Sequence, residues 1–192
     1  GESGGQVGDT GRMTTALGAI VEVGDTQRPA VDVIVHRGRL SGGELSVGDT
    51  VSLSIDGERR QAIRLNHSAT HLLHAALRNH LGDGVAQAGS LVDAERLRFD
   101  FSHDGAVSDE KLADIEDEVN GVIRANLEVG CQEMPYKDAL ASGALAFFGE
   151  KYGDTVRVVR MGDYSVELCG GTHVARTGDI GLLTLAGQTA VA

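Results

Sequence analysis

The hydrophobic pattern of this chain changes its period near residue 62, and this change most restricts the folds open to it. Between residues 14 and 60, the stretches TTALGAIVEV, AVDVIVHRG and ELSVGDTVSLSIDGERR are rich in strand-forming residues and are separated by turn signals. From Asn66, apolar residues recur every three or four positions until Gly82-Asp83-Gly84. We therefore expect an α+β chain, with a small antiparallel β-barrel over residues 1–61 followed by a helix-plus-antiparallel-sheet domain over residues 62–192.

Two further helices and three strands are predicted beyond residue 100. Ser108 can cap a helix over residues 109–127. The acidic residues that follow it also suit the positive end of a helix. Residues 136–148 have a shorter helical pattern that is interrupted at Gly143. The runs TVRVVRM, YSVELCG and DIGLLTLAG have the composition of strands. The second part is therefore predicted to be a sheet with helices on one face.

Composition restricts the classes of function. The chain carries 17 Lys and Arg against 28 Asp and Glu, a formal charge of −11, which is the wrong sign for holding nucleic acid by bulk electrostatics. Two cysteines in 192 residues form no disulfide framework and fit a reducing cytosol. No apolar run reaches the roughly 18 residues that a membrane span needs. We interpret four acidic residues of the second helix as a solvated face: Asp114, Glu116, Asp117 and Glu118.

Two pairs of potential metal ligands lie about one hundred residues apart. His67 and His71 share one face of the first predicted helix, away from its apolar stripe. Cys169 and His173 have the same separation, with two glycines between them that permit a tight turn. Three imidazoles and one thiolate suit a tetrahedral zinc ion. The alternatives are solvent-exposed histidines and an inert cysteine, and Cys131, with no neighbouring histidine, is expected to be buried.

A zinc ion at these residues has two possible roles. Four protein ligands favour a closed structural site, whereas a catalytic site keeps one position open. Thr70, Gln87 and Ser90 are candidates to line a cleft beside the histidines, which favours a catalytic site, but spacing leaves both roles open. The residue after His67 is Ser68 rather than the glutamate of H-E-x-x-H enzymes, which argues against a metalloprotease.

Longer strings resemble the editing domain of alanyl-tRNA synthetases. They are NHSATHLLHAALRNHLGDGVAQAGSLVDAERLRFDFSH, GEKYGDTVRVV and ELCGGTHVARTGDIG, and the string GESGGQVGDTG resembles that family's glycine-rich motif. The resemblance spans essentially the whole chain. It implies a small β-barrel subdomain followed by an α+β domain, which is shared with the threonyl-tRNA synthetase editing module and with free-standing alanyl-tRNA editing proteins. This organisation agrees with the change of pattern near residue 62.

The resemblance implies hydrolysis of the ester that joins serine or glycine to tRNA(Ala), as part of an alanine-tRNA ligase. Such a second site is physically reasonable, because a pocket for alanine cannot cleanly exclude the smaller glycine or the hydroxyl-bearing serine. The residues that match zinc ligands are His67, His71, Cys169 and His173. Those that match the amino-acid pocket are Thr70, Gln87 and Ser90. Those that match the glycine-rich motif, which is implied to lie near the site, are Gly4, Gly5 and Gln6.

The implied partners are the acceptor end of tRNA(Ala) and the remaining synthetase domains, and the implied location is the cytoplasm. The acidic balance then has an explanation, since other domains would supply most of the affinity for RNA. Five arginines are candidates for phosphate contacts: Arg12, Arg37, Arg39, Arg64 and Arg78. Other functions stay open: a tRNA-binding module with a structural zinc, a free-standing aminoacyl-tRNA deacylase, and an unrelated zinc hydrolase of small esters.

Overall fold

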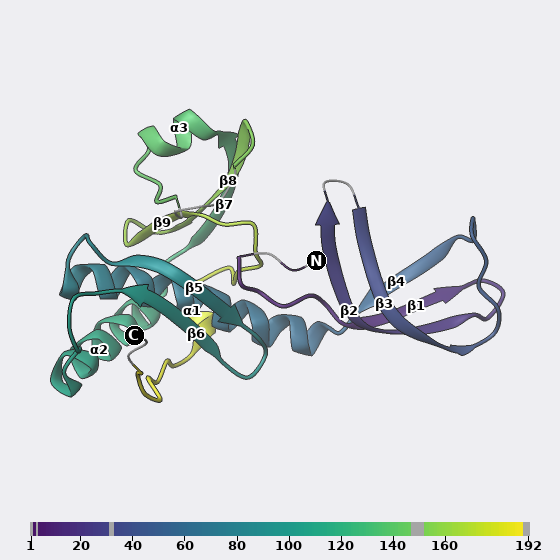
Figure 1. Cartoon of the computed structure of the whole chain (residues 1–192), viewed down its shortest axis with the longest axis horizontal. Helices are drawn as coiled ribbons and strands as arrows, with labels where there is room; N and C mark the ends of the chain where they lie inside the picture. The colour runs from purple at the N-terminus through teal and green to yellow at the C-terminus, as the bar shows by residue number, and fades with distance from the viewer. Residues whose placement is uncertain (1, 3, 31–32, 147–151, 190–192) are drawn as a thin grey trace.

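The computed structural model describes residues 2, 4–30, 33–146 and 152–189. The α+β class is confirmed: a four-stranded sheet lies at one end of the molecule, and helix α1 joins it to a body of helices and two smaller sheets (Figure 1). None of the helices in these ranges is both long and apolar enough to cross a bilayer.

The N-terminal sheet is antiparallel and open. Its strands are β1 (Gly11–Thr15), β2 (Ile20–Ala30), β3 (Val33–Gly42) and β4 (Val51–Ile55), in the order β3-β2-β1-β4. Edge strands β3 and β4 do not pair in the part of the chain that the structure describes, so the expected closure into a barrel is wrong. The chain passes directly from β4 into α1, so β4 is not followed by a further strand that could join it to β3.

Helix α1 (Gly57–Leu81) begins earlier than the periodicity predicts. Asp56 and Gly57 are a pair typical of turns, but they start the helix, because the Asp56 side chain accepts a hydrogen bond from the backbone N–H of Arg59 at 3.0 Å. A short acidic side chain serves a turn and a helix cap equally well, which explains the error. The predicted boundary at residue 62 therefore falls inside α1.

The body surrounds α1. A hairpin of β5 (Ala86–Val92) and β6 (Leu97–Ser102) contacts the helix, as do α2 (Asp109–Ala125) and β9 (Ser165–Leu168). Strand β9 belongs to a second antiparallel sheet with β7 (Val129–Pro135) and β8 (Thr155–Met161). The expectation of one sheet with helices on one face is thus wrong, because two sheets contact the same helix.

Two helices of the body compare differently with their predictions. The Ser108 cap of α2 is confirmed, since the Ser108 hydroxyl accepts a hydrogen bond from the backbone N–H of Lys111 at 3.2 Å. Helix α3 (Tyr136–Ala141) is shorter than predicted, because Gly143 has a φ of +85° that turns the chain away. Residues 147 and 148 of that predicted helix lie outside the described residues.

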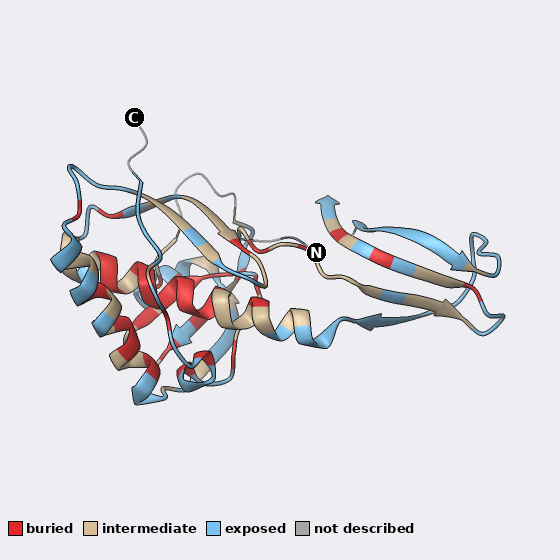
Figure 2. Cartoon of the chain, turned by 90° about the horizontal axis from the view of Figure 1, so that it is seen from below, coloured by how far each residue is buried: buried red, intermediate tan, exposed pale blue. Residues whose placement is uncertain are grey.

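The main core lies between α1, α2 and the sheets of the body. Its fully enclosed members include Leu72 on α1, Ile115 and Val119 on α2, and Met161 on β8. Figure 2 shows that buried residues gather in this body, while the N-terminal sheet is largely exposed. The body therefore supplies a rigid support around the middle of α1.

The run DIGLLTLAG is not a strand. Its first two residues belong to a short 3₁₀ helix, η1 (Thr177–Ile180), and the rest continues as an extended segment along α2. The side-chain amide of Asn120 pairs with this segment as a neighbouring strand would, accepting from Leu183 N and donating to Leu183 O, each at 2.9 Å. Hydrogen bonds from a side chain thus take the place of those that a neighbouring strand would form.

The acidic face of α2 is only partly solvated. Asp114 and Asp117 are exposed as expected. Glu116 instead accepts a hydrogen bond from Leu185 N at 2.5 Å, and Glu118 accepts one from the Tyr164 hydroxyl at 2.6 Å. These two carboxylates connect α2 to its neighbours, so the interpretation of a wholly solvated face is wrong for them.

Candidate metal centre and cleft

The four predicted ligands converge at the middle of α1. Ligand atoms of His67, His71, Cys169 and His173 all lie within 4.8 Å of one another. The Cys169 sulfur is 3.3 Å from His67 Nε2. Rings of His67 and His173 have centroids 4.6 Å apart, and those of His71 and His173 are 5.0 Å apart.

These histidines are not on a wet surface. His67 and His71 are 2% and 4% exposed, because α1 is enclosed here by β5, β6, β9 and α2. Every residue from His67 to Leu77 except Ala75 is buried. The alternative of solvent-exposed histidines is therefore wrong: His67 and His71 lie off the helix's own apolar stripe and still inside the protein.

The hydrogen bonds of the three histidines fix which ring nitrogen is available to a metal. Each Nδ1 contacts an oxygen, and the partners of His67, His71 and His173 are Gln6 Oε1 at 2.8 Å, Glu167 Oε2 at 2.5 Å and Ser68 Oγ at 3.4 Å. The Nε2 atoms of His71 and His173 are buried without a hydrogen-bond partner. Metal-binding histidines commonly hold one nitrogen this way and present the other. Three such nitrogens and a thiolate fit zinc.

The charges of the site favour the anionic ligand that a metal needs. Burial opposes ionisation of Cys169, but the charge of His71 and hydrogen bonds from the surrounding imidazoles lower the pKa of the thiol well below its usual range. Burial likewise opposes ionisation of Glu167, yet the charge and hydrogen bond of His71 lower the pKa of this carboxyl to about 2. A thiolate is the form of cysteine that binds metal.

A cavity of about 250 Å³ opens beside the cluster. Its walls include the three pocket residues predicted from sequence, Thr70, Gln87 and Ser90, together with His67, His71 and Cys169. His173 does not line it. The Thr70 hydroxyl donates to Asn66 O at 2.9 Å, the ordinary hydrogen bond of a threonine in a helix. The Ser90 hydroxyl is buried and has no hydrogen-bond partner.

Glycines allow the backbone to approach the ligands. A Cβ on Gly4, which lines the cavity, would lie 3.8 Å from His67 Cε1 and 3.9 Å from the Cys169 sulfur. A Cβ on Gly5, where φ is +77°, would lie 2.6 Å from Ser90 O. The glycine-rich segment therefore lies against the site, and any side chain at Gly4 would fill space beside the ligands.

Sequence reasoning missed two residues that support the ligands. Glu167 is 1% exposed and accepts hydrogen bonds from His71 and from His74 Nδ1, the latter at 2.8 Å. The Arg157 guanidinium donates from Nη1 to Cys169 O at 3.0 Å and from Nη2 to the Cys131 sulfur at 3.0 Å. The alternation of YSVELCG was a usable signal for Glu167, since it places this charge on the same face as buried Ser165.

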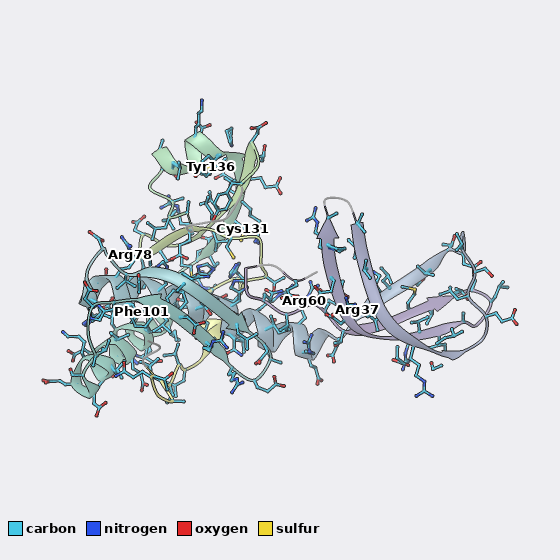
Figure 3. The ribbon with its side chains drawn as sticks, viewed as in Figure 1. Arg37, Arg60, Arg78, Phe101, Cys131 and Tyr136 are labelled. Atoms are coloured by element: carbon cyan, nitrogen blue, oxygen red, sulfur yellow. The ribbon has the colours of Figure 1, made fainter. Side chains whose placement is uncertain are left out.

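Cys131 is exposed, so its expected burial is wrong. It lies on β7, an edge strand of the sheet β7-β8-β9, and its neighbour across the sheet is Val159. Figure 3 shows Cys131 beside this sheet. The general preference of free cysteine for the core does not decide its burial on an edge strand, where the strand is paired on one side alone within the described residues.

The candidate phosphate-binding arginines are dispersed. Arg37 lies on the N-terminal sheet, and Arg78 lies on α1 in the body (Figure 3). Arg12 pairs with Glu22 at 2.9 Å and Arg78 pairs with Asp83 at 2.9 Å. Arg64, one turn of α1 before His67, forms no ion pair with another described residue, and its Nε is buried without a partner.

Comparison with known proteins agrees with this geometry. The family model described as the threonyl and alanyl tRNA synthetase second additional domain matches residues 156–192, and that of class II (A) tRNA synthetases matches residues 1–59. The alanine-tRNA ligase of Dichelobacter nodosus is 58% identical over 194 residues, and that of Magnetococcus marinus is 56% identical over 192. The chain belongs to the alanyl-tRNA synthetase family. It is covered completely by both relatives and spans 22% of the length of each.

The two matched segments meet at the candidate metal centre. The second additional domain of the alanyl-tRNA synthetase family contributes Cys169 and His173, and the class II segment contributes the glycine-rich stretch. Helix α1, with His67 and His71, lies between them in the sequence. The candidate site is therefore assembled from three separate parts of the chain.

Proposed function

We propose that this member of the alanyl-tRNA synthetase family is an editing deacylase that hydrolyses the ester of serine or glycine with the terminal ribose of tRNA(Ala). The observation that carries the proposal is the convergence of three imidazoles and one thiol beside a cavity of about 250 Å³, whose wall includes His67, His71 and Cys169. A cavity next to the ligands suits a site where a substrate reacts. The names of the relatives support tRNA(Ala) as the RNA.

His67, His71, Cys169 and His173 would hold a zinc ion. When bound, zinc can polarise an ester carbonyl or lower the pKa of a water. Glu167 does not act as a free base in this arrangement, since both of its oxygens accept hydrogen bonds, from His71 and His74. Its role is to orient His71.

The polar residues of the cavity would recognise serine. Because the Thr70 hydroxyl already donates to Asn66 O, it has only acceptor capacity left for a ligand. Ser90 and Gln87 can each donate or accept. Seryl-tRNA would pair with the buried hydroxyl of Ser90, whereas the methyl group of alanyl-tRNA would leave it unpaired, which costs free energy. The cavity would thus favour serine over alanine.

The proposal includes partners and a location. The acceptor end of tRNA(Ala) would enter the cavity, and the remaining domains of a full-length synthetase would supply most of the RNA affinity that a chain of charge −11 lacks. The reducing cytoplasm suits a site that depends on a free thiolate.

One assay tests the function. The zinc-loaded chain is incubated with seryl-tRNA(Ala) and with alanyl-tRNA(Ala), with and without a chelator, and ester loss is followed. We expect faster loss of the seryl ester and its abolition by the chelator. Loss of neither ester at high protein concentration would favour the alternative of a tRNA-binding module with a structural zinc. Equal loss of both esters would contradict the discriminating pocket.

A further inference from the structure

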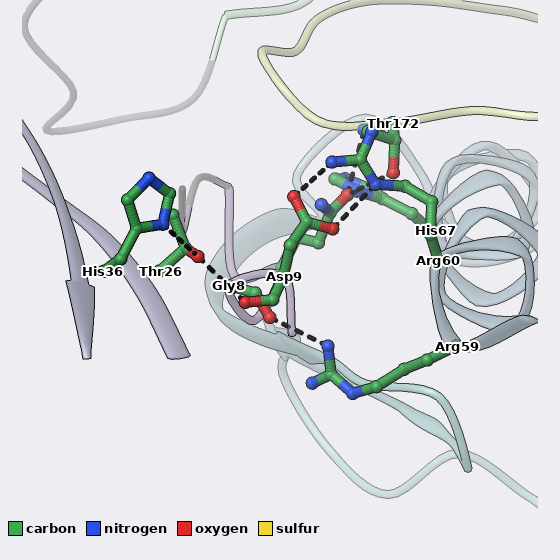
Figure 4. A network of polar contacts seen from close by, with 9 residues as sticks. Gly8, Asp9, Thr26, His36, Arg59, Arg60, His67 and Thr172 are labelled. Carbon is green, nitrogen blue, oxygen red and sulfur yellow. Dashed lines mark hydrogen bonds and ion pairs between the residues drawn. The ribbon is translucent and has the colours of Figure 1, made fainter. Parts of the chain in front are cut away.

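Gln6 is buried at the junction of the three parts that form the metal centre. It is 3% exposed, and its Oε1 atom contacts three donors. These are Thr172 N at 2.9 Å, the Thr172 hydroxyl at 2.9 Å and His67 Nδ1 at 2.8 Å. Figure 4 shows His67 and Thr172 in this network of polar contacts. One oxygen therefore ties a ligand on α1 to the loop that carries Cys169 and His173.

The direction of these hydrogen bonds follows from Thr172. A backbone N–H can only donate, so the atom of Gln6 that faces it must be the amide oxygen. The same oxygen faces His67 Nδ1, which must then carry the proton. A neutral His67 consequently has its lone pair on Nε2, the atom 3.3 Å from the Cys169 sulfur. Gln6 thus selects the tautomer that can bind a metal.

The segment around Gln6 is held on both sides. Val7 N donates to Val92 O at 3.0 Å and Val92 N donates to Gly5 O at 2.9 Å, so residues 5–7 run parallel to the end of β5. Further along, Asp9 forms an ion pair with Arg60 at the start of α1 (Figure 4). The Gln6 side chain is therefore directed at the metal centre by a fixed backbone.

We propose that Gln6 is a positioning residue of the metal centre, which fixes His67 in the metal-binding tautomer and holds the loop of Cys169 and His173 against α1. The inference rests on the proposed metal site. It adds a requirement to that proposal. The four ligands alone are then not sufficient for metal binding, because the glycine-rich segment must also supply a hydrogen-bond acceptor for His67. A partner that holds the second nitrogen of a ligating histidine typically contributes 10–100-fold in metal affinity.

The test compares three substitutions in the full chain. Gln6→Leu removes the acceptor, whereas Gln6→Glu keeps two oxygens that can receive the same three donors. Gln27→Leu is the matched control, since the Gln27 side chain lies on the N-terminal sheet and its hydrogen bonds among the described residues go to Asp25 on the same strand. Co²⁺ binding is followed by the visible absorption of the thiolate-bound ion, and zinc affinity is measured by competition with a chelator. Circular dichroism checks the fold of each variant.

We expect Gln6→Leu to lower zinc affinity about 10–100-fold, with Gln6→Glu and Gln27→Leu close to wild type. The tautomer has its own signature: ¹⁵N NMR of the histidines should find the proton of His67 on Nδ1 in the zinc-loaded wild type and in Gln6→Glu. Undiminished affinity in folded Gln6→Leu would overturn the inference, as would a large loss in folded Gln6→Glu. If wild type bound no Co²⁺ at all, the proposed metal site would itself be wrong, and the role of Gln6 with it.

Discussion

Gly171 occupies a position where the ligands leave no room for a side chain. A Cβ there would lie 2.0 Å from His67 Cε1 and 2.4 Å from His67 Nδ1. Because the ring of His67 is enclosed, Gly171→Ala must displace either the ligand or the loop that contains Cys169. We predict a loss of Co²⁺ affinity of at least tenfold, measured by titration of the visible absorption. Gly84→Ala is the control, since nothing lies within 4 Å of its Cβ, and equal binding by both variants would refute the prediction.

Cys169 and Gln87 should separate metal binding from substrate binding. Cys169→Ala removes a ligand, so zinc affinity and deacylation should fall together. Gln87→Ala leaves the ligands intact and should retain zinc while it lowers turnover or the preference for the seryl ester. Zinc content by atomic absorption and deacylation kinetics measure the two effects. Equal loss of zinc in both variants would show that Gln87 is wrongly assigned.

At this scale the clustering of the four side chains was predictable, and the residues that support them were not. The separation of four between His67 and His71, repeated between Cys169 and His173, identifies a cluster that the structure brings within 4.8 Å. Spacing along one helix says nothing about Glu167, which reaches His71 from a strand almost one hundred residues away. Contacts between remote segments depend on tertiary packing, which local pattern does not encode.

At the scale of elements, the strongest periodicities predicted the interiors of helices and missed their ends. Helix α2 begins where its Ser108 cap predicts. The start of helix α1 at Gly57 was missed because its first turns are polar. A polar, exposed turn has no hydrophobic period to detect. The segment after η1 was predicted as a strand because it has the composition of one. Its backbone groups instead form hydrogen bonds with side chains of α2.

A substitution at Asn120 tests whether its side-chain hydrogen bonds hold the segment after η1 in place of a neighbouring strand. Asn120→Leu removes the donor and acceptor for Leu183 inside the core and leaves buried backbone groups unpaired. We predict a loss in the free energy of unfolding of about 1–3 kcal/mol, measured by urea denaturation. Asp117→Asn, on the exposed side of the same helix, should change stability by less than about 0.5 kcal/mol. Similar stability of the two variants would mean that the segment is held mainly by its apolar contacts.

Glu118 should make the packing of α1 on α2 sensitive to acid. Burial opposes its ionisation, but hydrogen bonds from Tyr164, Asn79 and His80 lower the pKa of this carboxyl. Since the pKa is lower in the folded chain than in the unfolded chain, the stabilisation is present above the unfolded pKa and is lost as pH falls through the folded one. Thermal unfolding from pH 7 to pH 3 should therefore show a smaller decrease in Tm for Glu118→Gln than for wild type, and parallel curves would contradict this.

At the scale of the whole molecule, the two parts contribute unequally. The N-terminal sheet leaves apolar side chains such as Leu53 and Ile55 about half exposed, at 58% and 48%. The strand-rich stretches and turn signals were sufficient to predict an antiparallel arrangement, but closure depends on whether the edge strands can meet, which local pattern does not determine. The body, by contrast, encloses α1 and supplies most of the metal centre, while the N-terminal segment supplies Gln6 and the glycines.

The charge of the whole molecule implies that the proposed RNA binding would depend on a few local cations. With a net charge of −11, the chain can attract a phosphate only where an arginine is not already neutralised. Arg12 and Arg78 have carboxylate partners, whereas Arg64 has none among the described residues and lies one turn of α1 from His67. Arg64 is therefore the candidate to test for a contact with the phosphates of an RNA end that enters the proposed site.

We therefore predict that Arg64→Gln weakens the binding of tRNA(Ala) to the zinc-loaded chain and reduces the slope of log Kd against log salt concentration by about 1, the amount expected for one lost phosphate contact. Arg12→Gln removes the same charge from the exposed sheet, so it controls for the change in net charge. Fluorescence anisotropy with labelled tRNA at several salt concentrations measures both quantities. Identical slopes for the two variants would place the RNA away from Arg64, because a general effect of net charge cannot distinguish one arginine from another.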